Sequence, residues 1–167
     1  MGIPIIAPYL EKPKIEQLKG GFVVRYFGLT DNSGHFVHSN GDSSECPVYG
    51  FYIASDNEPI RLVYITDAEF CKYRFSNINN LLIGINYMDS LVENEEETKK
   101  RHVLNGHMSL DTAKEFIKTT DRERTLNNVI VCHMSDSNSD IPTFEEEIRK
   151  VTQANIRFAR KGQVINL

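Results

Sequence analysis

The chain has 167 residues, a length that supports one sizeable hydrophobic core and gives no reason to divide it into two domains. Hydrophobic residues make up 40% and charged residues 25% of the chain, which excludes a disordered polypeptide and a collagen-like repeat. The net charge of -4 argues against general affinity for duplex nucleic acid, because that affinity depends on Lys and Arg neutralising phosphates. We therefore expect a single domain over residues 1–167.

Cysteine usage and the N-terminal residues bear on the compartment. Cys46, Cys71 and Cys132 are far apart and form no CxxC pair, which is typical of a reducing cytoplasm rather than of a disulfide scaffold. The first eight residues lack the charged start and the long apolar run of a signal peptide or a membrane span. We expect a cytoplasmic protein without a membrane segment.

The first half of the chain has the composition of strands. Residues 3–7 are apolar enough for a core strand, which suggests a missing beginning; an edge strand that tolerates Pro4 is the alternative. After a polar connection, β-branched and aromatic residues predict strands at 20–29, 35–38, 48–54, 61–66 and 81–86. The strands at 48–54 and 61–66 are expected to pair through a polar turn.

The second half alternates helices with strands. Charge pairs at i,i+4 spacing predict a solvated helix over 90–101, and Ser109 is a plausible N-cap of the next helix. A short β-branched run, 129–131, predicts a buried strand that ends at His133. Thr143 and Glu146 form a capping-box pattern, and 155–167 is typical of a hairpin about 161–162. This order of elements favours an α/β layered domain over a helical bundle.

Three predicted strands end near a side chain that can bind metal. These are His38, Asp67 and His133, and imidazole and carboxylate are the ligands expected for catalytic zinc or for manganese. Taken singly, a histidine at a strand end is more often a surface or hydrogen-bonded residue, and Asp67 equally suits a turn cap. Together they suggest a metal that activates water.

The local sequences around these residues resemble a known family. Residues 38–53, 63–67, 105–109 and 129–135 read HSNGDSSECPVYGFYI, VYITD, NGHMS and VIVCHMS. Their order resembles the metallo-β-lactamase superfamily, in particular the branch of ribonuclease Z-like nucleases, WalJ/YycJ-like proteins and phage cyclic-nucleotide phosphodiesterases. The TD pair after an apolar strand is common, whereas GHMS, a helix and then VCHMS are more specific.

The resemblance implies a role for each motif residue. His38 would be a ligand of a first metal, Asp67 would bridge two metals and His133 would be a ligand of the second. His107 would lie beside the substrate phosphate and assist proton transfer or orientation; an ordinary residue before a helix is the alternative reading. Zinc or manganese would be the cofactor in the complete fold.

Two departures from the family pattern limit what this chain can do by itself. The His-x-His-x-Asp-His loop that supplies most metal ligands is absent, and Gly84 stands where relatives often place a glutamate, so we expect His107 to lack an acidic partner. With only His38, Asp67 and His133, neither metal position has three protein ligands, and we expect weak metal binding. The implied fold is an αββα sandwich that is incomplete at its N-terminal side, with an apolar face and a strand edge left open.

The leading hypothesis is the C-terminal part of a phosphodiesterase that acts on a nucleic acid or a cyclic nucleotide. An N-terminal companion chain would complete it, and a homo-oligomer is the other partner expected. The alternative is a non-catalytic remnant that serves as an oligomerisation or binding module. A β-lactamase or thioesterase activity is a third option, since the fold alone does not choose the chemistry.

Overall fold

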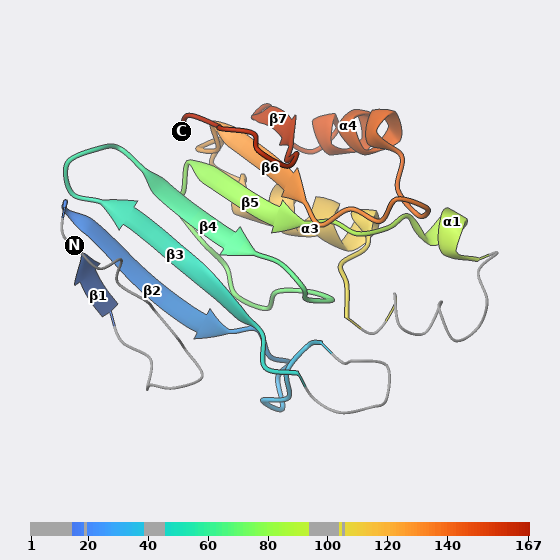
Figure 1. Ribbon diagram of the computed structural model, residues 1–167, viewed down its shortest axis with the longest axis horizontal. Helices are drawn as coiled ribbons and strands as arrows, with labels where there is room; N and C mark the ends of the chain where they lie inside the picture. Colours follow the sequence, from blue (N-terminus) through green and yellow to red (C-terminus); the bar gives the residue numbers. More distant parts are fainter. Residues whose placement is uncertain (1–14, 19, 39–45, 94–103, 105) are drawn as a thin grey trace.

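The computed structural model describes residues 15–18, 20–38, 46–93, 104 and 106–167, with only the backbone described at 15–18. One seven-stranded sheet contains the strands in their order along the chain (Figure 1). The strands are β1 Ile15–Leu18, β2 Phe22–Gly28, β3 Tyr49–Ser55, β4 Arg61–Ile65, β5 Asn80–Gly84, β6 Asn128–Cys132 and β7 Asn155–Phe158. The predicted segment 3–7 and most of the predicted helix 90–101 lie outside the described residues.

The sheet has an antiparallel half and a parallel half. Strands β1 to β4 pair antiparallel, and β4 to β7 pair parallel. The predicted β3–β4 hairpin is confirmed: Ser55 Oγ accepts hydrogen bonds from the backbone N–H groups of Asn57 and Glu58 and so shapes its turn. The parallel strands need longer connections, which residues 66–79 and the two main helices provide.

Three helices are described, α1 Asp89–Val92, α3 Leu110–Thr120 and α4 Ile141–Arg149. Ser109 is the N-cap of α3 as predicted, and its hydroxyl accepts from Thr112 N–H. The capping box predicted for α4 is wrong. Asp140 is the N-cap and accepts from the backbone N–H of Thr143, because Pro142 in the first turn lets the helix begin earlier.

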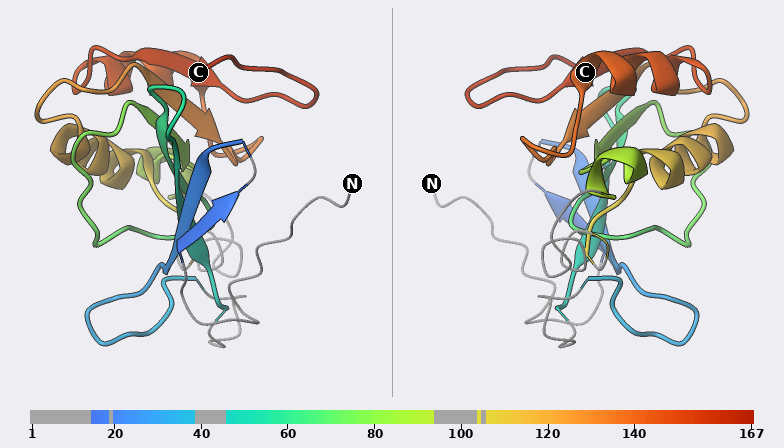
Figure 2. Two further views of the ribbon diagram at one scale, coloured as in Figure 1. Left: turned by 90° about the vertical axis from the view of Figure 1, so that its left-hand side faces the viewer. Right: turned by 90° about the vertical axis from the view of Figure 1, so that its right-hand side faces the viewer.

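The hydrophobic core lies between one face of the sheet and helices α3 and α4 (Figure 2). The central strands β4, β5 and β6 each contribute two side chains with no exposed surface, and the helices contribute aromatic and aliphatic residues. These core residues are Val63, Ile65, Leu81, Ile83, Val129, Val131, Ala113, Ile117, Phe144 and Ile148. Successive side chains of a strand point to opposite faces of the sheet, so only every second strand residue faces this core.

The opposite face of the sheet, here called the inner face, is also apolar. Strand register aligns its side chains across five strands, and several of them are only half-buried. The inner face consists of Val24, Tyr26, Phe51, Ile53, Leu62, Tyr64, Leu82 and Ile130. A sheet that is apolar on both faces is typical of one that another layer covers.

Three strand predictions differ from the structure. Residues 35–38 form no strand, and only Phe36 makes an isolated bridge, with Thr30. The predicted C-terminal hairpin is wrong because β7 pairs parallel with β6, while 163–167 have no strand geometry. Strand β1 was not predicted, since its sequence, IEQL, is short and half polar. None of the described helices has the length and apolar composition needed to cross a bilayer.

Candidate metal centre

Asp67 and His133 lie at the carboxyl ends of neighbouring parallel strands. Asp67 follows β4 by two residues, His133 directly follows β6, and β5 lies between these strands. Because parallel strands end at the same edge of a sheet, the two side chains approach each other although 66 positions separate them (133 − 67). This is the edge at which open α/β sheets place their ligands.

Both residues have left-handed backbone conformations, with φ of 51° at Asp67 and 56° at His133. Such values are uncommon for residues other than glycine, although Asp and His tolerate them better than most. Each strand therefore turns sharply at the residue that carries the functional group. Conformations of this kind concentrate at functional sites, where the surrounding structure holds them in place.

Asn86, just after β5, fixes the loops that carry both histidines. Its side-chain amide donates to the carbonyl of His133 at 2.9 Å, and its backbone carbonyl accepts from Ser135 N–H at 2.9 Å. Its own N–H donates to the carbonyl of Met108, next to His107, at 2.9 Å. Asn86 is 8% exposed, so these bonds are shielded from water and position the His107 and His133 loops relative to each other.

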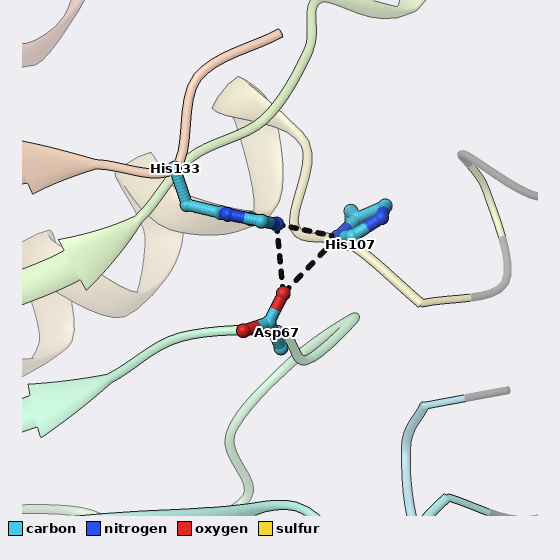
Figure 3. A group of neighbouring side chains, drawn as sticks. All are labelled: Asp67, His107 and His133. Atoms are coloured by element: carbon cyan, nitrogen blue, oxygen red, sulfur yellow. Dashed lines mark hydrogen bonds and ion pairs between the residues drawn. The ribbon is translucent and has the colours of Figure 1, made fainter. Parts of the chain in front are cut away.

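His107 completes a group of three potential ligands with Asp67 and His133 (Figure 3). His133 Nε2 lies 2.7 Å from Asp67 Oδ1, and His107 Nδ1 lies 3.8 Å from the same oxygen. The two imidazole nitrogens are 3.3 Å apart. One ligand atom from each residue thus falls within 4.8 Å of the others, and all three side chains point into the same space.

The Asp67–His133 contact changes the protonation of both groups. The hydrogen bond from His133 lowers the pKa of Asp67 more than partial burial raises it, and the positive charges of the neighbouring histidines add to this effect. The reciprocal bond raises the pKa of His133 against the opposing effect of burial. Asp67 is therefore an anion at neutral pH, while His133 keeps its proton to a higher pH than a free histidine.

His38 lies beside this group but is not one of its three members. Its ring centroid is 5.7 Å from that of His107, and its Nδ1 is 2.9 Å from the carbonyl of Gly106. Because a carbonyl only accepts, Nδ1 is the donor, and the lone pair of the neutral ring is then on Nε2. Metal-binding histidines commonly have this arrangement, with one nitrogen held by a carbonyl and the other free to bind.

Glu69 is a further acidic residue near His38 that the sequence motifs did not single out. Its backbone N–H donates to the carbonyl of Val37 at 3.0 Å, which brings the loop after β4 against the segment that ends at His38. Burial raises the pKa of the Glu69 carboxyl, and the charge of His38 opposes this shift. The only available sequence signal was a second carboxylate two positions after Asp67.

The expectation that His107 lacks an acidic partner is wrong, because Asp67 is within ion-pair distance of it. Gly84, where relatives often have a glutamate, has no room for a side chain. A Cβ atom there would lie 2.9 Å from Thr66 Oγ1 and 3.2 Å from Thr66 Cα. The close approach of β5 to the end of β4 thus requires glycine, and Asp67 supplies the negative charge instead.

The donor set fits a zinc or manganese ion. Two imidazoles and one carboxylate are the ligand types expected for these metals, and three protein ligands leave positions open for water or substrate. Asp67 is ionised, as a ligand must be, and the His133 proton can be displaced. The Asp67 and His133 side chains are 39% and 40% exposed, so the centre is open to solvent on one side.

Comparisons with known proteins agree with this architecture. No protein-family model matches the sequence, and no match was found among curated proteins. Solved structures, however, do resemble the chain, among them the following three. The metallo-β-lactamase fold protein YhfI from Bacillus subtilis is 15% identical, with a TM-score of 0.56 over 89% of this chain and 51% of that protein. Unliganded yeast PDE1 is 16% identical, with a TM-score of 0.62 over 91% and 48%. Zn²⁺-bound PqqB from Methylobacterium extorquens is 17% identical, with a TM-score of 0.58 over 93% and 54%.

These likenesses establish the class of the protein at the level of its fold. It is an α/β protein that forms part of a metallo-β-lactamase fold, as the sequence motifs predicted. The chain spans about half the length of the solved structures it matches. The part that it contains includes one sheet, the helices on one face of that sheet, and the edge that carries Asp67, His107 and His133.

Proposed function

We propose that this chain forms one part of the metal centre of a phosphodiester hydrolase of metallo-β-lactamase type. The observation that carries the proposal is the convergence of Asp67, His107 and His133 within 4.8 Å at the carboxyl edge of the parallel strands. These residues come from three separate segments, so the tertiary fold, and not the conformation of a single loop, brings them together. PqqB, a structural neighbour, is Zn²⁺-bound, which supports metal binding by this fold.

Each residue has a distinct task in the proposed centre. A bound zinc or manganese ion would supply an activated water and neutralise charge on a phosphate. Asp67 offers an anionic oxygen, and His133 gives up its proton to offer Nε2. His107 Nδ1 faces the same space, so we assign His107 as a third ligand rather than as a group beside the substrate. His38, held by the Gly106 carbonyl, offers Nε2 to an adjacent position.

A phosphodiester is the substrate class that the motifs and the neighbours favour. The sequences around His38, Asp67, His107 and His133 resemble the phosphodiester-hydrolysing branch of the superfamily, and yeast PDE1 is among the structural neighbours. The open side of the centre leaves room for a phosphate to reach the metal. A nucleic acid and a cyclic nucleotide both present this group, and both remain candidate substrates.

We further propose that residues outside these 167 complete the metal centre. Among the described residues, three grouped ligands and His38 fall short of the full set for two metals, and the His-x-His-x-Asp-His sequence does not occur in the chain. The apolar inner face of the sheet fits a second layer that would bring the missing ligands. A further segment of the same polypeptide or a companion chain would supply both.

The test of this function is reconstitution. The purified chain should hydrolyse bis(4-nitrophenyl) phosphate at the background rate in zinc or manganese. Addition of the polypeptide encoded immediately upstream, provided that it contains His-x-His-x-Asp-His, should produce metal-dependent hydrolysis. Tight binding of two metal ions per chain and hydrolysis without a partner would contradict the incompleteness. Failure of the assembled protein to hydrolyse any phosphodiester would contradict the function.

A non-catalytic oligomerisation module is a second candidate, and the inner face is the observation that favours it. The five strands β2 to β6 offer large apolar side chains there, among them the stacked pair Phe51 and Tyr64, whose ring centroids are 6.2 Å apart. This function predicts a stable homo-oligomer whose melting temperature does not change when chelator is added. The hydrolase predicts that zinc raises the melting temperature and that the Asp67→Asn substitution removes this increase.

A further inference from the structure

A groove on the helix-bearing face of the sheet lies over β2 and β3, on residues that the metal centre does not use. Its floor consists of Val23, Arg25 and Phe27 from β2 and Tyr52 from β3. Its wall consists of residues 73–75 in the connection between β4 and β5. The groove has a volume of about 430 Å³, which is within the usual range for small-molecule sites.

The walls of the groove combine aromatic rings with positive charge. Phe27 is 5.2 Å from Tyr73 and 5.3 Å from Phe75, centroid to centroid, and Tyr73 is 37% exposed. Arg25 and Arg74 are both exposed at the groove. No carboxylate is among the described residues that line the groove, and the salt bridges between described residues do not involve either arginine.

This pairing of groups favours one chemical class of ligand. A guanidinium binds phosphate oxygens with two parallel hydrogen bonds, and a partly exposed aromatic ring such as that of Tyr73 stacks with a planar base. The chain as a whole has a net charge of -4, so two arginines that form no ion pair with the described residues make the groove locally positive. Duplex nucleic acid would meet repulsion over the rest of the surface, whereas a single nucleotide fits within the groove.

We propose that this groove, formed by Arg25, Tyr52, Tyr73 and Arg74 over β2 and β3, binds the base and phosphate of a nucleotide at a site separate from the metal centre. The ring of Tyr73 stacks with the base, and the guanidinium groups of Arg25 and Arg74 hold the phosphate. The site needs neither a metal nor the missing ligands, so its existence does not depend on the proposed hydrolase.

The residues 66–79 give the groove a physical link to the metal centre. This connection starts beside Asp67 and then forms the groove wall with Tyr73, Arg74 and Phe75. The Phe75 ring also packs against Phe116 of α3, with 6.3 Å between centroids. A nucleotide in the groove therefore contacts the same connection that carries a candidate metal ligand.

Calorimetric titration of the chain with AMP in the presence of EDTA tests the site. We expect AMP to bind. Adenosine and inorganic phosphate should each bind at least about tenfold more weakly than AMP, because each makes only one of the two contacts. Tyr73→Ala should weaken AMP binding about tenfold and Tyr73→Phe less than about twofold, because phenylalanine keeps the ring. Arg25→Gln and Arg74→Gln should each weaken it about tenfold.

Arg160→Gln is the matched control, because Arg160 is an exposed arginine that does not line the groove, and it should bind AMP as the unmodified chain does. A short oligoadenylate identifies the source of the nucleotide: tighter binding than AMP, lost in the same variants, assigns the groove to a single strand. Weaker binding than AMP assigns it to free nucleotides. Absence of AMP binding at millimolar concentration would overturn the proposal. So would equal binding of phosphate, or affinity unchanged in Tyr73→Ala and both arginine variants.

Discussion

The parallel and antiparallel halves of the sheet differ in both cover and chemistry. Strands β4 to β6 are buried beneath α3 and α4, and the side chains at their carboxyl edge form the candidate metal centre. Strands β2 and β3 extend beyond this cover and form the floor of an open groove with exposed arginine and tyrosine. The buried half holds its functional groups in fixed positions, whereas the open half offers a surface.

This difference follows from how the strands are connected. Parallel strands need crossovers, and here the β5–β6 and β6–β7 crossovers contain α3 and α4, which bury the strands. The antiparallel strands β3 and β4 connect through a short turn, which brings no covering layer with it. We therefore expect substitutions in the parallel half to affect stability and metal binding strongly. Substitutions in the antiparallel half should affect ligand affinity with little loss of stability.

The largest effect is expected from His133→Ala in the assembled hydrolase. Loss of one of three grouped ligands should lower metal-dependent hydrolysis about a thousandfold, because the metal then has too few protein ligands to stay in place. His35→Ala, in an exposed turn, is the matched control and should keep the activity. Full activity of the His133→Ala assembly, measured at saturating metal, would contradict the ligand assignment.

The second prediction compares one isoleucine from each half of the sheet. Ile83→Ala in β5 should lower the free energy of unfolding by about 2–5 kcal/mol, because Ile83 is fully buried and its loss leaves a cavity. Ile53→Ala in β3, on the half-buried inner face, should cost about 1 kcal/mol in the isolated chain. Urea titrations of both variants measure the difference, and equal losses would contradict the contrast between the halves.

The third prediction concerns the cap of α3. Ser109→Ala should lower the free energy of unfolding by about 1 kcal/mol, because the Thr112 N–H loses its acceptor. Because the capped first turn of α3 directly follows the loop that carries His107, zinc affinity should fall with the stability of this turn. Ser109→Asp restores a capping oxygen and should recover the stability. A Ser109→Ala chain with unchanged stability in urea would show that the cap contributes nothing.

The smallest effect is the pH dependence of the metal-free chain. The raised pKa of His133 stabilises the fold fully below pH 6.5, its ordinary pKa, and this contribution is lost as the pH rises through the raised value. The lowered pKa of Asp67 stabilises the fold above pH 3.8, and this contribution is lost as the pH falls through the lowered value. The pair therefore contributes most between pH 3.8 and 6.5. Because both groups are partly exposed, its contribution should be below about 1 kcal/mol.

Melting temperatures in EDTA across this range, compared between the unmodified chain and His133→Gln, measure the contribution of the pair. Above pH 6.5 the melting temperature of the unmodified chain should fall as His133 loses its proton, and the variant should lack this part of the fall. Zinc affinity should show the opposite dependence and rise over the same pH range, because binding displaces the His133 proton. Identical pH profiles of the two chains would show that the Asp67–His133 bond does not form in solution.

The sequence predicted the central strands of the sheet better than its two edge strands, β1 and β7. The runs at 61–66, 81–86 and 129–131 are apolar and β-branched because their strands are buried, and this composition is a strong local signal. Strand β1 has no such signal, and β7 was assigned to a hairpin because periodicity does not show which neighbour a strand pairs with. The start of α4 was misplaced because Asp140 and Thr143 are both acceptable N-caps, and only the structure shows which is used.

Prediction of the site depended on which groups the topology brings together. Asp67 and His133 were predictable because both follow apolar strands, and parallel strands share an edge. The family resemblance placed His107 at the site, but its grouping with Asp67 and His133 as a potential third ligand could not be predicted. That grouping depends on the hydrogen bonds of Asn86 to two loops distant in sequence. The groove also could not have been predicted, since residues 73–75 meet β2 only through the long connection between β4 and β5.

The most direct test of the central claim is zinc binding by the chain and by four single alanine variants, at Asp67, His107, His133 and His38. Elemental analysis after dialysis and competition with a chromogenic chelator measure the zinc content and the affinity. We predict that the unmodified chain binds about one zinc ion. Loss of Asp67, His107 or His133 should weaken binding at least about a hundredfold, whereas loss of His38 should weaken it less than about tenfold. Zinc affinity that is unchanged in the His107 and His133 variants would contradict the account.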